Sequence, residues 1–138
     1  MRELNRAAAE AALRHGLRAA TDVTGFGLVG HALNLARQSG VSLELELAAL
    51  PLLPGALELA PRFEPGGLKS NRRQFEPLVA DHAPPDPVLR TLLYDPQTSG
   101  GLLLPVSAPR AAALLAELPG AARIGRVLEA GPKPIVVR

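Results

Sequence analysis

The sequence predicts an α+β fold in which helices pack on a mixed β-sheet. Two segments near the start, around residues 4–16 and 28–40, repeat apolar side chains at helical spacing. Residues 41–47 then alternate between apolar and polar side chains, which is typical of a strand with one solvent-exposed face. Helix and strand patterns alternate over the rest of the chain. This order favours a helix pair at the front, followed by a sheet that helices cover.

The two leading helices each show one apolar face. In the first, which ends near Gly16, this face is formed by Leu4, Ala8, Ala11 and Ala12. In the second, which starts after a glycine-rich turn, the face is formed by Leu28, Ala32, Leu35 and Ala36. Gly40 follows the second face and predicts the C-terminal end of that helix.

The middle of the chain is predicted to hold one strand, one short helix and one long loop. A strand over 41–47 would place Glu44 and Glu46 on its solvated face. A short helical piece is expected over 54–60, where a Pro-Gly pair starts it. Residues 61–74 are rich in proline, glycine and basic side chains, so we expect a loop there.

The last third of the chain alternates again between helices and strands. Asp86 and Pro87 predict an N-cap and a first-turn proline for a helix that runs through Tyr94. After a break at 95–101, the expected elements are a buried strand at 102–106, a helix from 107 to 118, and two closing strands at 123–129 and 133–137.

Length and composition restrict the function classes. The chain has 138 residues, of which 47% are hydrophobic, so we expect a single domain over 1–138 with its own core. A net charge of +2 gives no reason to expect nucleic acid or an anionic membrane as a partner. The absence of cysteine excludes disulfides, thiolate metal sites and sulfur nucleophiles. No apolar run approaches the length of a membrane span, so we expect a soluble, cytoplasmic protein.

The first glycine-rich phrase, residues 21–28, places a carboxylate before a turn that opens a helix. Asp22 offers a hard oxygen ligand for a magnesium ion held between protein and phosphate. Thr24, Gly25 and Gly27 form the turn, where the glycines let the backbone approach a ligand or adopt positive φ. The start of the helix favours anions. The alternative is plain capping, with Asp22 or Thr24 satisfying the free N–H groups of the helix.

The second glycine-rich phrase covers residues 94–101 and also has two interpretations. One is a nest of backbone N–H groups that receives an anion such as phosphate. That nest would be formed by Thr98, Ser99, Gly100 and Gly101. The other is a tight turn in which Asp95 caps its own backbone and Pro96 fixes φ.

Two further features are interpreted structurally. Residues 66–73 combine two glycines with three basic side chains, and a solvated surface loop is preferred over a third anion-binding loop. His15 and His31 have no second histidine at metal-ligand spacing, so both are expected to have structural roles.

The two glycine-rich phrases, "TDVTGFGL" and "DPQTSGGLL", occur together with "LNRAA", "ALPLLPGALELA" and "PGG" followed by Asn71. In this order they resemble the C-terminal domain of selenophosphate synthetase (selenide, water dikinase), from about Leu4 to about Val127. Aminoimidazole ribonucleotide synthetase belongs to the same superfamily and matches the phrases less well. The resemblance implies the layered α-β-α arrangement of that superfamily's C-terminal domains. In the family the residue after the glycine pair is commonly Thr, so Leu68 and the shifted Asn71 depart from its pattern.

The resemblance also implies a reaction and cofactors. The family converts ATP, selenide and water to selenophosphate, AMP and phosphate, with Mg²⁺ bridging the ATP phosphates. Asp22 matches the aspartate that reaches across to the N-terminal domain and helps to hold the magnesium ions. Thr24, Gly25 and Gly27 match the residues around that aspartate, and are expected to shape the turn, with backbone contact to phosphate as a lesser role.

The family's selenium-handling residue and most of its ATP and metal ligands belong to an N-terminal domain that precedes the "LNRAA" helix. We expect that domain to be absent from this chain, which would then be inactive alone and would hold no catalytic residue. The expected partner is an N-terminal ATP-binding domain, and a homo-oligomer is a second option. The alternative hypothesis is a non-enzymatic module for anion binding or protein interaction, which keeps the fold and uses Asp22 only as a cap.

Overall fold

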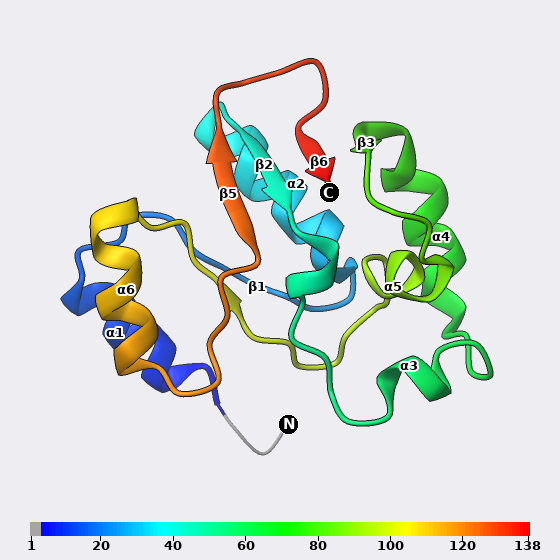
Figure 1. The fold of residues 1–138 in the computed structure, drawn as a ribbon, viewed down its shortest axis with the longest axis horizontal. Coiled ribbons are helices and arrows are strands. Elements are labelled where there is room, and N and C mark those ends of the chain that lie inside the picture. The colour runs from blue at the N-terminus through cyan, green and yellow to red at the C-terminus, as the bar shows by residue number, and fades with distance from the viewer. Residues whose placement is uncertain (1–3) are drawn as a thin grey trace.

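The computed structural model describes residues 4–138 (Figure 1). Its α-helices are α1 (Arg6–Arg14), α2 (Gly27–Ser39), α3 (Ala56–Leu59), α4 (Gly66–Phe75), α5 (Pro87–Leu92) and α6 (Ala108–Glu117). Two 3₁₀ turns are η1 (Leu47–Ala49) and η2 (Glu76–Leu78). The strands are β1 (Thr21–Asp22), β2 (Ser42–Leu45), β3 (Val79–Asp81), β4 (Leu102–Leu103), β5 (Gly125–Leu128) and β6 (Ile135–Val137).

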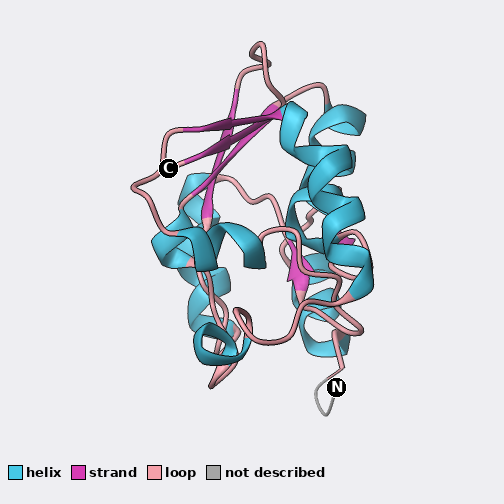
Figure 2. Ribbon diagram, turned by 90° about the vertical axis from the view of Figure 1, so that its right-hand side faces the viewer, coloured by secondary structure: helices cyan, strands magenta, loops and turns pink. Residues whose placement is uncertain are grey.

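The main sheet is mixed, as predicted for the α+β class. Its strand order is β3-β6-β2-β5, in which β2 pairs parallel with β6 and antiparallel with β5, while β3 pairs parallel with β6. Figure 2 shows these strands gathered at one end of the molecule, with helices beside and below them. A second, two-stranded ribbon joins β1 to β4 in antiparallel register.

The core lies between α2 and the main sheet. Helix α2 contributes buried side chains to this core, including Val29, Ala32, Leu33 and Ala36. They meet the apolar sides of β2 and β6, which are Leu43, Leu45, Ile135 and Val137. Each large apolar side chain buried in this way contributes about 1.5–3 kcal/mol. Gly40 ends α2 with φ of 65°, the left-handed conformation that glycine adopts most readily, as predicted.

Helices α1 and α6 form a second packing unit beside the sheet (Figure 1). Ala11 and Ala12 of α1 and Leu114 of α6 are buried. Glu117 joins the two helices because it accepts hydrogen bonds from Arg14 and pairs with the His15 ring at 2.8 Å. The predicted structural role of His15 fits this contact.

The predicted solvated face of the 41–47 strand is wrong for Glu44. Only 4% of its side chain is exposed, and the Nε atoms of Arg126 and Arg138 each lie 2.7 Å from its carboxylate oxygens. These hydrogen bonds, first from Arg126 and then from Arg138, hold the pKa of Glu44 below its usual range. Glu46 remains partly exposed, as predicted, with its side chain 42% accessible.

Four segments differ from the predicted elements. Residues 66–75 form helix α4 instead of a loop, and β1 and β3 occupy segments for which no strand was predicted. Strand β4 covers only 102–103 of the predicted 102–106. Pro105 has no backbone N–H to donate, which is consistent with the early end of this strand.

No helix within residues 4–138 is both long enough and apolar enough to cross a lipid bilayer.

Candidate functional site

The β1–β4 ribbon brings the two glycine-rich phrases into direct contact. Asp22 is opposite Leu102 in the ribbon. Beyond it, the Val23 N–H donates to the Gly101 carbonyl at 3.1 Å, and the Gly100 N–H donates to the Val23 carbonyl at 2.9 Å. The Gln97 N–H extends this pairing to the Thr24 carbonyl at 3.0 Å. Residues about 75 positions apart in the sequence therefore share one backbone framework.

Two glycines make this close approach feasible. Gly27 has φ of 69°, and a Cβ atom there would lie 2.8 Å from the Tyr94 carbonyl carbon. A Cβ atom on Gly100 would lie 2.4 Å from the Val23 carbonyl oxygen. Both distances are shorter than a Cβ atom tolerates, so Gly27 and Gly100 are needed for packing between the phrases.

The other two predicted glycines are open. A Cβ atom on Gly25 or Gly101 would meet nothing within 4 Å, and both residues are exposed. Thr98 and Ser99 are also exposed in the loop that leads to Gly101. The predicted phosphate-contacting residues therefore divide into packed and open positions, and the open ones leave backbone accessible on both phrases.

Asp22 is a near neighbour of these open positions, because it pairs with Leu102, which follows Gly101, and precedes Gly25 by three residues. Its side chain is exposed, and no hydrogen bond or ion pair with another residue of the described chain engages its carboxylate. The capping alternative is wrong, because the N-cap position of α2 is Phe26 and no side chain caps it. Thr24 instead contacts the His31 ring, with Oγ1 3.1 Å from Nε2.

Asp95 begins the second loop, and it does not cap its own backbone as one alternative predicted. No side-chain hydrogen bond to Asp95 occurs within residues 4–138. The side chain is half-buried, and this desolvation raises the pKa of the Asp95 carboxyl above its usual range.

Three polar side chains on different helices or helix starts hold the two phrases, and none was predicted as a site residue. Asn5, which precedes α1, donates to the Gly100 carbonyl at 3.1 Å. His31 of α2 contacts Thr24, as described above. Asn71 of α4 donates to the Gly25 carbonyl at 2.8 Å and to the Tyr94 carbonyl at 3.1 Å. The sequence signal was that Asn5 lies in "LNRAA" and that Asn71 follows "PGG", both of which belong to the phrases that carry the family resemblance.

The interpretation of 66–73 as a solvated loop is therefore wrong. Leu68 and Asn71 are buried on the inner side of α4. Two of the basic side chains pair with neighbouring carboxylates, Lys69 with Glu64 at 3.3 Å and Arg72 with Glu76 at 3.1 Å. Helix α4 acts as a support for the two phrases and presents its charges outward.

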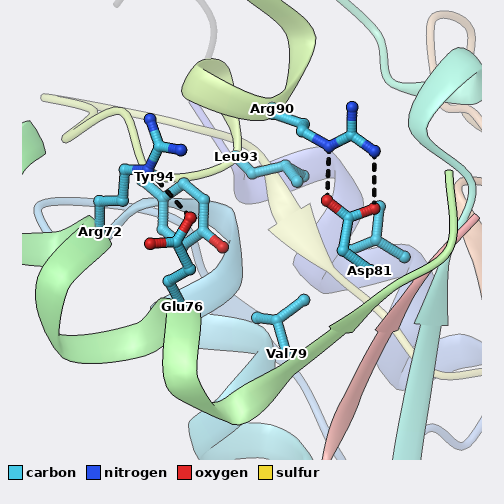
Figure 3. A pocket seen from close by; sticks show the side chains of 8 residues that line it. Arg72, Glu76, Val79, Asp81, Arg90, Leu93 and Tyr94 are labelled. Atoms are coloured by element: carbon cyan, nitrogen blue, oxygen red, sulfur yellow. Dashed lines mark hydrogen bonds and ion pairs between the residues drawn. The ribbon is translucent and has the colours of Figure 1, made fainter. Parts of the chain in front are cut away.

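A small cavity of about 80 Å³ lies behind this support (Figure 3). The Arg90 guanidinium pairs with Asp81 at one side, and that hydrogen bond holds the pKa of Asp81 below its usual range. Arg72 and Glu76 pair at the other side, beside the Tyr94 ring. Burial, followed by the charge of Glu76, raises the pKa of Tyr94 to about 12. The charged side chains of this cavity pair with one another, Arg72 with Glu76 and Arg90 with Asp81.

A larger groove of about 1050 Å³ is lined by Gly101 and by residues of β4, α6 and β5. Its apolar lining includes Leu102 and Leu103 of β4 and Leu114 and Leu115 of α6. The groove is thus continuous with the ribbon that carries Asp22, and most of its lining side chains are apolar.

The arrangement can supply one carboxylate and accessible backbone to a ligand. Within residues 4–138, no group of three histidine, aspartate or glutamate side chains lies together in a way that could hold a metal ion. Asp22 is consequently suited to be one ligand among several, the others coming from a bound phosphate, water or another polypeptide segment.

Comparison with known proteins gives the family. The family model for AIR synthase related protein, C-terminal domain, matches residues 1–137. A selenide, water dikinase of Caldanaerobacter subterraneus subsp. tengcongensis is 42% identical over 144 residues, which cover all of this chain and 42% of the relative. A selenide, water dikinase of Nitratidesulfovibrio vulgaris is 46% identical over 136 residues, or 94% of this chain and 38% of the relative. The chain thus spans about two fifths of the length of these curated relatives.

Solved structures show the same fold. The thiamine-monophosphate kinase of Stenotrophomonas maltophilia K279a superposes with a TM-score of 0.58 and 23% identity, over 88% of this chain and 31% of that protein. A structure described as AaThiL complexed with AMPPCP and TMP superposes with a TM-score of 0.50 and 25% identity, over 88% and 30%. The sequence match, the α+β fold and these neighbours agree, and the chain belongs to the family of AIR synthase related proteins, as a C-terminal domain of the selenide, water dikinase-like type.

Proposed function

We propose that residues 1–138 form the single C-terminal domain of a selenide, water dikinase and supply one wall of its active site. In this proposal the reaction converts ATP, selenide and water to selenophosphate, AMP and phosphate. Support comes from the relatives, which carry that name and match at 42% and 46% identity. The neighbour in complex with AMPPCP supports nucleotide binding by the same architecture.

The observation that carries the proposal is the free carboxylate of Asp22, a residue that neighbours two open backbone segments. Asp22 is exposed and unengaged by the described chain, while Gly25 and Gly101 leave room for a ligand at the backbone. A carboxylate kept out of internal ion pairs is available to a cation, and hard oxygen donors suit Mg²⁺.

The residues fit a magnesium ion that also binds phosphate. Mg²⁺ usually takes one or two protein carboxylates together with phosphate oxygens and water. Asp22 would provide the carboxylate, and the exposed backbone at Gly25, Thr98, Ser99 and Gly101 would face the phosphates. Helix α2 begins at Gly27, so its positive end lies in the same turn and favours an anion there. When bound, Mg²⁺ would neutralise phosphate charge during transfer.

The remainder of the site would come from an N-terminal ATP-binding domain. One carboxylate on one wall does not clamp a phosphoryl group on its own, since such transfer needs several charges preorganised around it. In the proposal these 138 residues are therefore inactive alone. The apolar groove offers a surface for the second domain, because its lining includes Leu102, the ribbon partner of Asp22.

The test is to mix the purified chain with the separately expressed N-terminal part of the Caldanaerobacter relative and to measure selenide-dependent AMP formation. We expect activity only in the mixture. Asp22→Asn should lower kcat by about 10²-fold or more, since it removes a metal ligand from the transferring phosphates. Glu129→Gln is the matched control, because Glu129 is also an exposed carboxylate but lies beyond β5.

Two outcomes would contradict the proposal. Equal activity of the Asp22→Asn and Glu129→Gln variants would show that Asp22 is not a ligand. Phosphate binding to the chain without activity in an associated mixture would favour the second candidate, a non-enzymatic anion-binding module. The open backbone at Gly25 and Gly101 is the observation that favours this second candidate.

A further inference from the structure

We propose that Asn71 is a positioning residue for the site described above, and this inference rests on the proposed function. Its side-chain amide clamps the turn after Asp22 to the segment that begins the second loop. The clamp would set where the Asp22 carboxylate stands relative to the open backbone of the two phrases. Asn71 itself would touch neither metal nor nucleotide.

The contacts of Asn71 define its orientation. Nδ2 lies 2.8 Å from the Gly25 carbonyl oxygen and 3.1 Å from the Tyr94 carbonyl oxygen. Carbonyl oxygens only accept hydrogen bonds, so the amide nitrogen must face both partners. Each of the two amide hydrogens then has one partner. With 6% of the residue exposed, the side chain is almost fully withdrawn from solvent.

Asn71 acts at a junction where the two phrases are closely packed. The backbone of Tyr94 is the same segment that leaves no room for a Cβ atom on Gly27. The main-chain pairs from Val23 to Gly101 and from Gln97 to Thr24 join the phrases on the side of the ribbon. Asn71 adds a side-chain link between Gly25 and Tyr94, for which the described chain provides no direct backbone pair; the neighbouring backbone link is the Val29 N–H, which donates to the Leu93 carbonyl at 3.1 Å.

Helix α4 gives the clamp a fixed base. Leu68 and Phe75 are 3% and 6% exposed, and they anchor the helix one turn on either side of Asn71. The Phe75 ring also meets Phe26 of the first phrase edge-on, with 6.2 Å between ring centroids. Because the helix is anchored, the Asn71 amide can hold the Gly25 and Tyr94 carbonyls at fixed positions relative to each other.

The consequence for catalysis is geometric. Gly25 is three residues after Asp22, so a shift of its carbonyl moves the turn that carries the carboxylate. A misplacement of about 1 Å can cost about 10²-fold in rate without loss of the fold. Loss of the clamp should therefore lower kcat and weaken the apparent affinity for Mg²⁺ while the affinity for selenide stays the same.

The first test uses Asn71→Asp, which keeps the shape but places an oxygen against two carbonyl oxygens. In the mixture with the ATP-binding domain we expect kcat to fall by at least about tenfold, with a higher Mg²⁺ concentration for half-maximal rate and an unchanged KM for selenide. Asn34→Asp, on the exposed side of α2, is the matched control and should leave all three unchanged. A fall in thermal stability with unchanged kcat and Mg²⁺ dependence would overturn the inference.

A double variant separates positioning from general damage. If Asn71 acts through Asp22, Asn71→Asp should change the rate by less than about twofold when Asp22→Asn is already present. If the double variant loses rate by the full product of the two single losses, the inference is overturned. Should Asp22→Asn alone have no effect, the proposed function fails, and the clamp is then judged by the measurement below.

Hydrogen exchange tests the clamp without any activity. In the isolated chain, Asn71→Asp should speed exchange of the Gly27, Gln97 and Gly100 amides, which donate within and between the phrases. The α6 amides should exchange as before, because that helix packs on α1. No change at the three amides, or equal acceleration throughout the chain, would overturn the clamp.

Discussion

At the scale of single residues, four glycines in two similar phrases have two different tasks. Gly27 and Gly100 sit where a Cβ atom would collide with backbone, whereas Gly25 and Gly101 face open space. The sequence presents all four as equivalent turn residues. Only the packing of one phrase against the other separates those needed for folding from those free to approach a ligand.

Replacing Gly27 and Gly25 separately tests this division. Gly27→Ala should lower the free energy of unfolding by at least about 2 kcal/mol, because the left-handed backbone and the contact with Tyr94 both oppose a Cβ atom. Gly25→Ala should change it by less than about 1 kcal/mol. Urea unfolding at pH 7 measures both. Equal losses in the two variants would refute the division.

Glu44 predicts a pH dependence. Its pKa is lowered in the folded protein, so its ion pairs with Arg126 and Arg138 stabilise the fold above the ordinary value of 4.5. That contribution disappears as the pH falls through the lowered pKa. Glu44→Gln should therefore be less stable than the parent at pH 7 and should lose less stability between pH 7 and pH 3.

Urea unfolding at the two pH values checks this prediction, with Glu46→Gln as the neighbouring control. Some acid sensitivity should remain in Glu44→Gln, because hydrogen bonds from arginines also lower the pKa of Asp81 and Glu117. An identical loss between pH 7 and pH 3 in parent and Glu44→Gln would contradict the assignment.

At the scale of elements, helix α5 offers a test of local sequence rules. The Asp86 carboxylate accepts hydrogen bonds from the N–H groups of Val88 and Leu89, at 3.1 and 2.9 Å. Asp86→Ala should lower the free energy of unfolding by about 1 kcal/mol, while Asp86→Asn should retain most of the cap. Thermal and urea unfolding measure this, and equal stabilities of all three proteins would show that the cap contributes nothing.

Elements whose signals are local were predictable from the sequence. The C-terminal end of α2 at Gly40 and the N-cap of α5 at Asp86 depend on neighbouring residues, and both are confirmed. Helix α4 was missed because Pro65, Gly66 and Gly67 at its start are typical of a loop. Its helical state depends instead on tertiary packing of Leu68 and Phe75.

Contacts between distant segments could not be predicted. Asn71 lies 46 residues from Gly25, and Asn5 lies 95 residues from Gly100, so no spacing rule links them. The alternation of apolar and polar residues around Glu44 indicated a solvent-exposed side chain. The ion pair that buries it could not be foreseen, because its partner Arg126 lies 82 residues away. Of the candidate site, the sequence therefore indicated the two phrases and Asp22, and the supporting side chains required the fold.

At the scale of the whole molecule, four of the segments that carry the family resemblance meet at the β1–β4 ribbon and the turns beside it. Asn5 contacts Gly100, the turn after Asp22 pairs with the second loop, and Asn71 holds both from α4. These segments therefore form one hydrogen-bonded surface that carries the free carboxylate of Asp22. The chain is a C-terminal domain of the AIR synthase related family. In the proposed function it would present this surface to the ATP-binding domain of a dikinase.

The most direct test of the central claim is calorimetric titration of ATP into the chain mixed with that ATP-binding domain, with Mg²⁺ and with EDTA. Our account predicts that Asp22→Asn raises the Kd for ATP about tenfold or more in Mg²⁺ and leaves it unchanged in EDTA, which corresponds to at least about 1.4 kcal/mol of lost metal-dependent binding. The same Kd for parent and Asp22→Asn in Mg²⁺ would contradict Asp22 as a metal ligand.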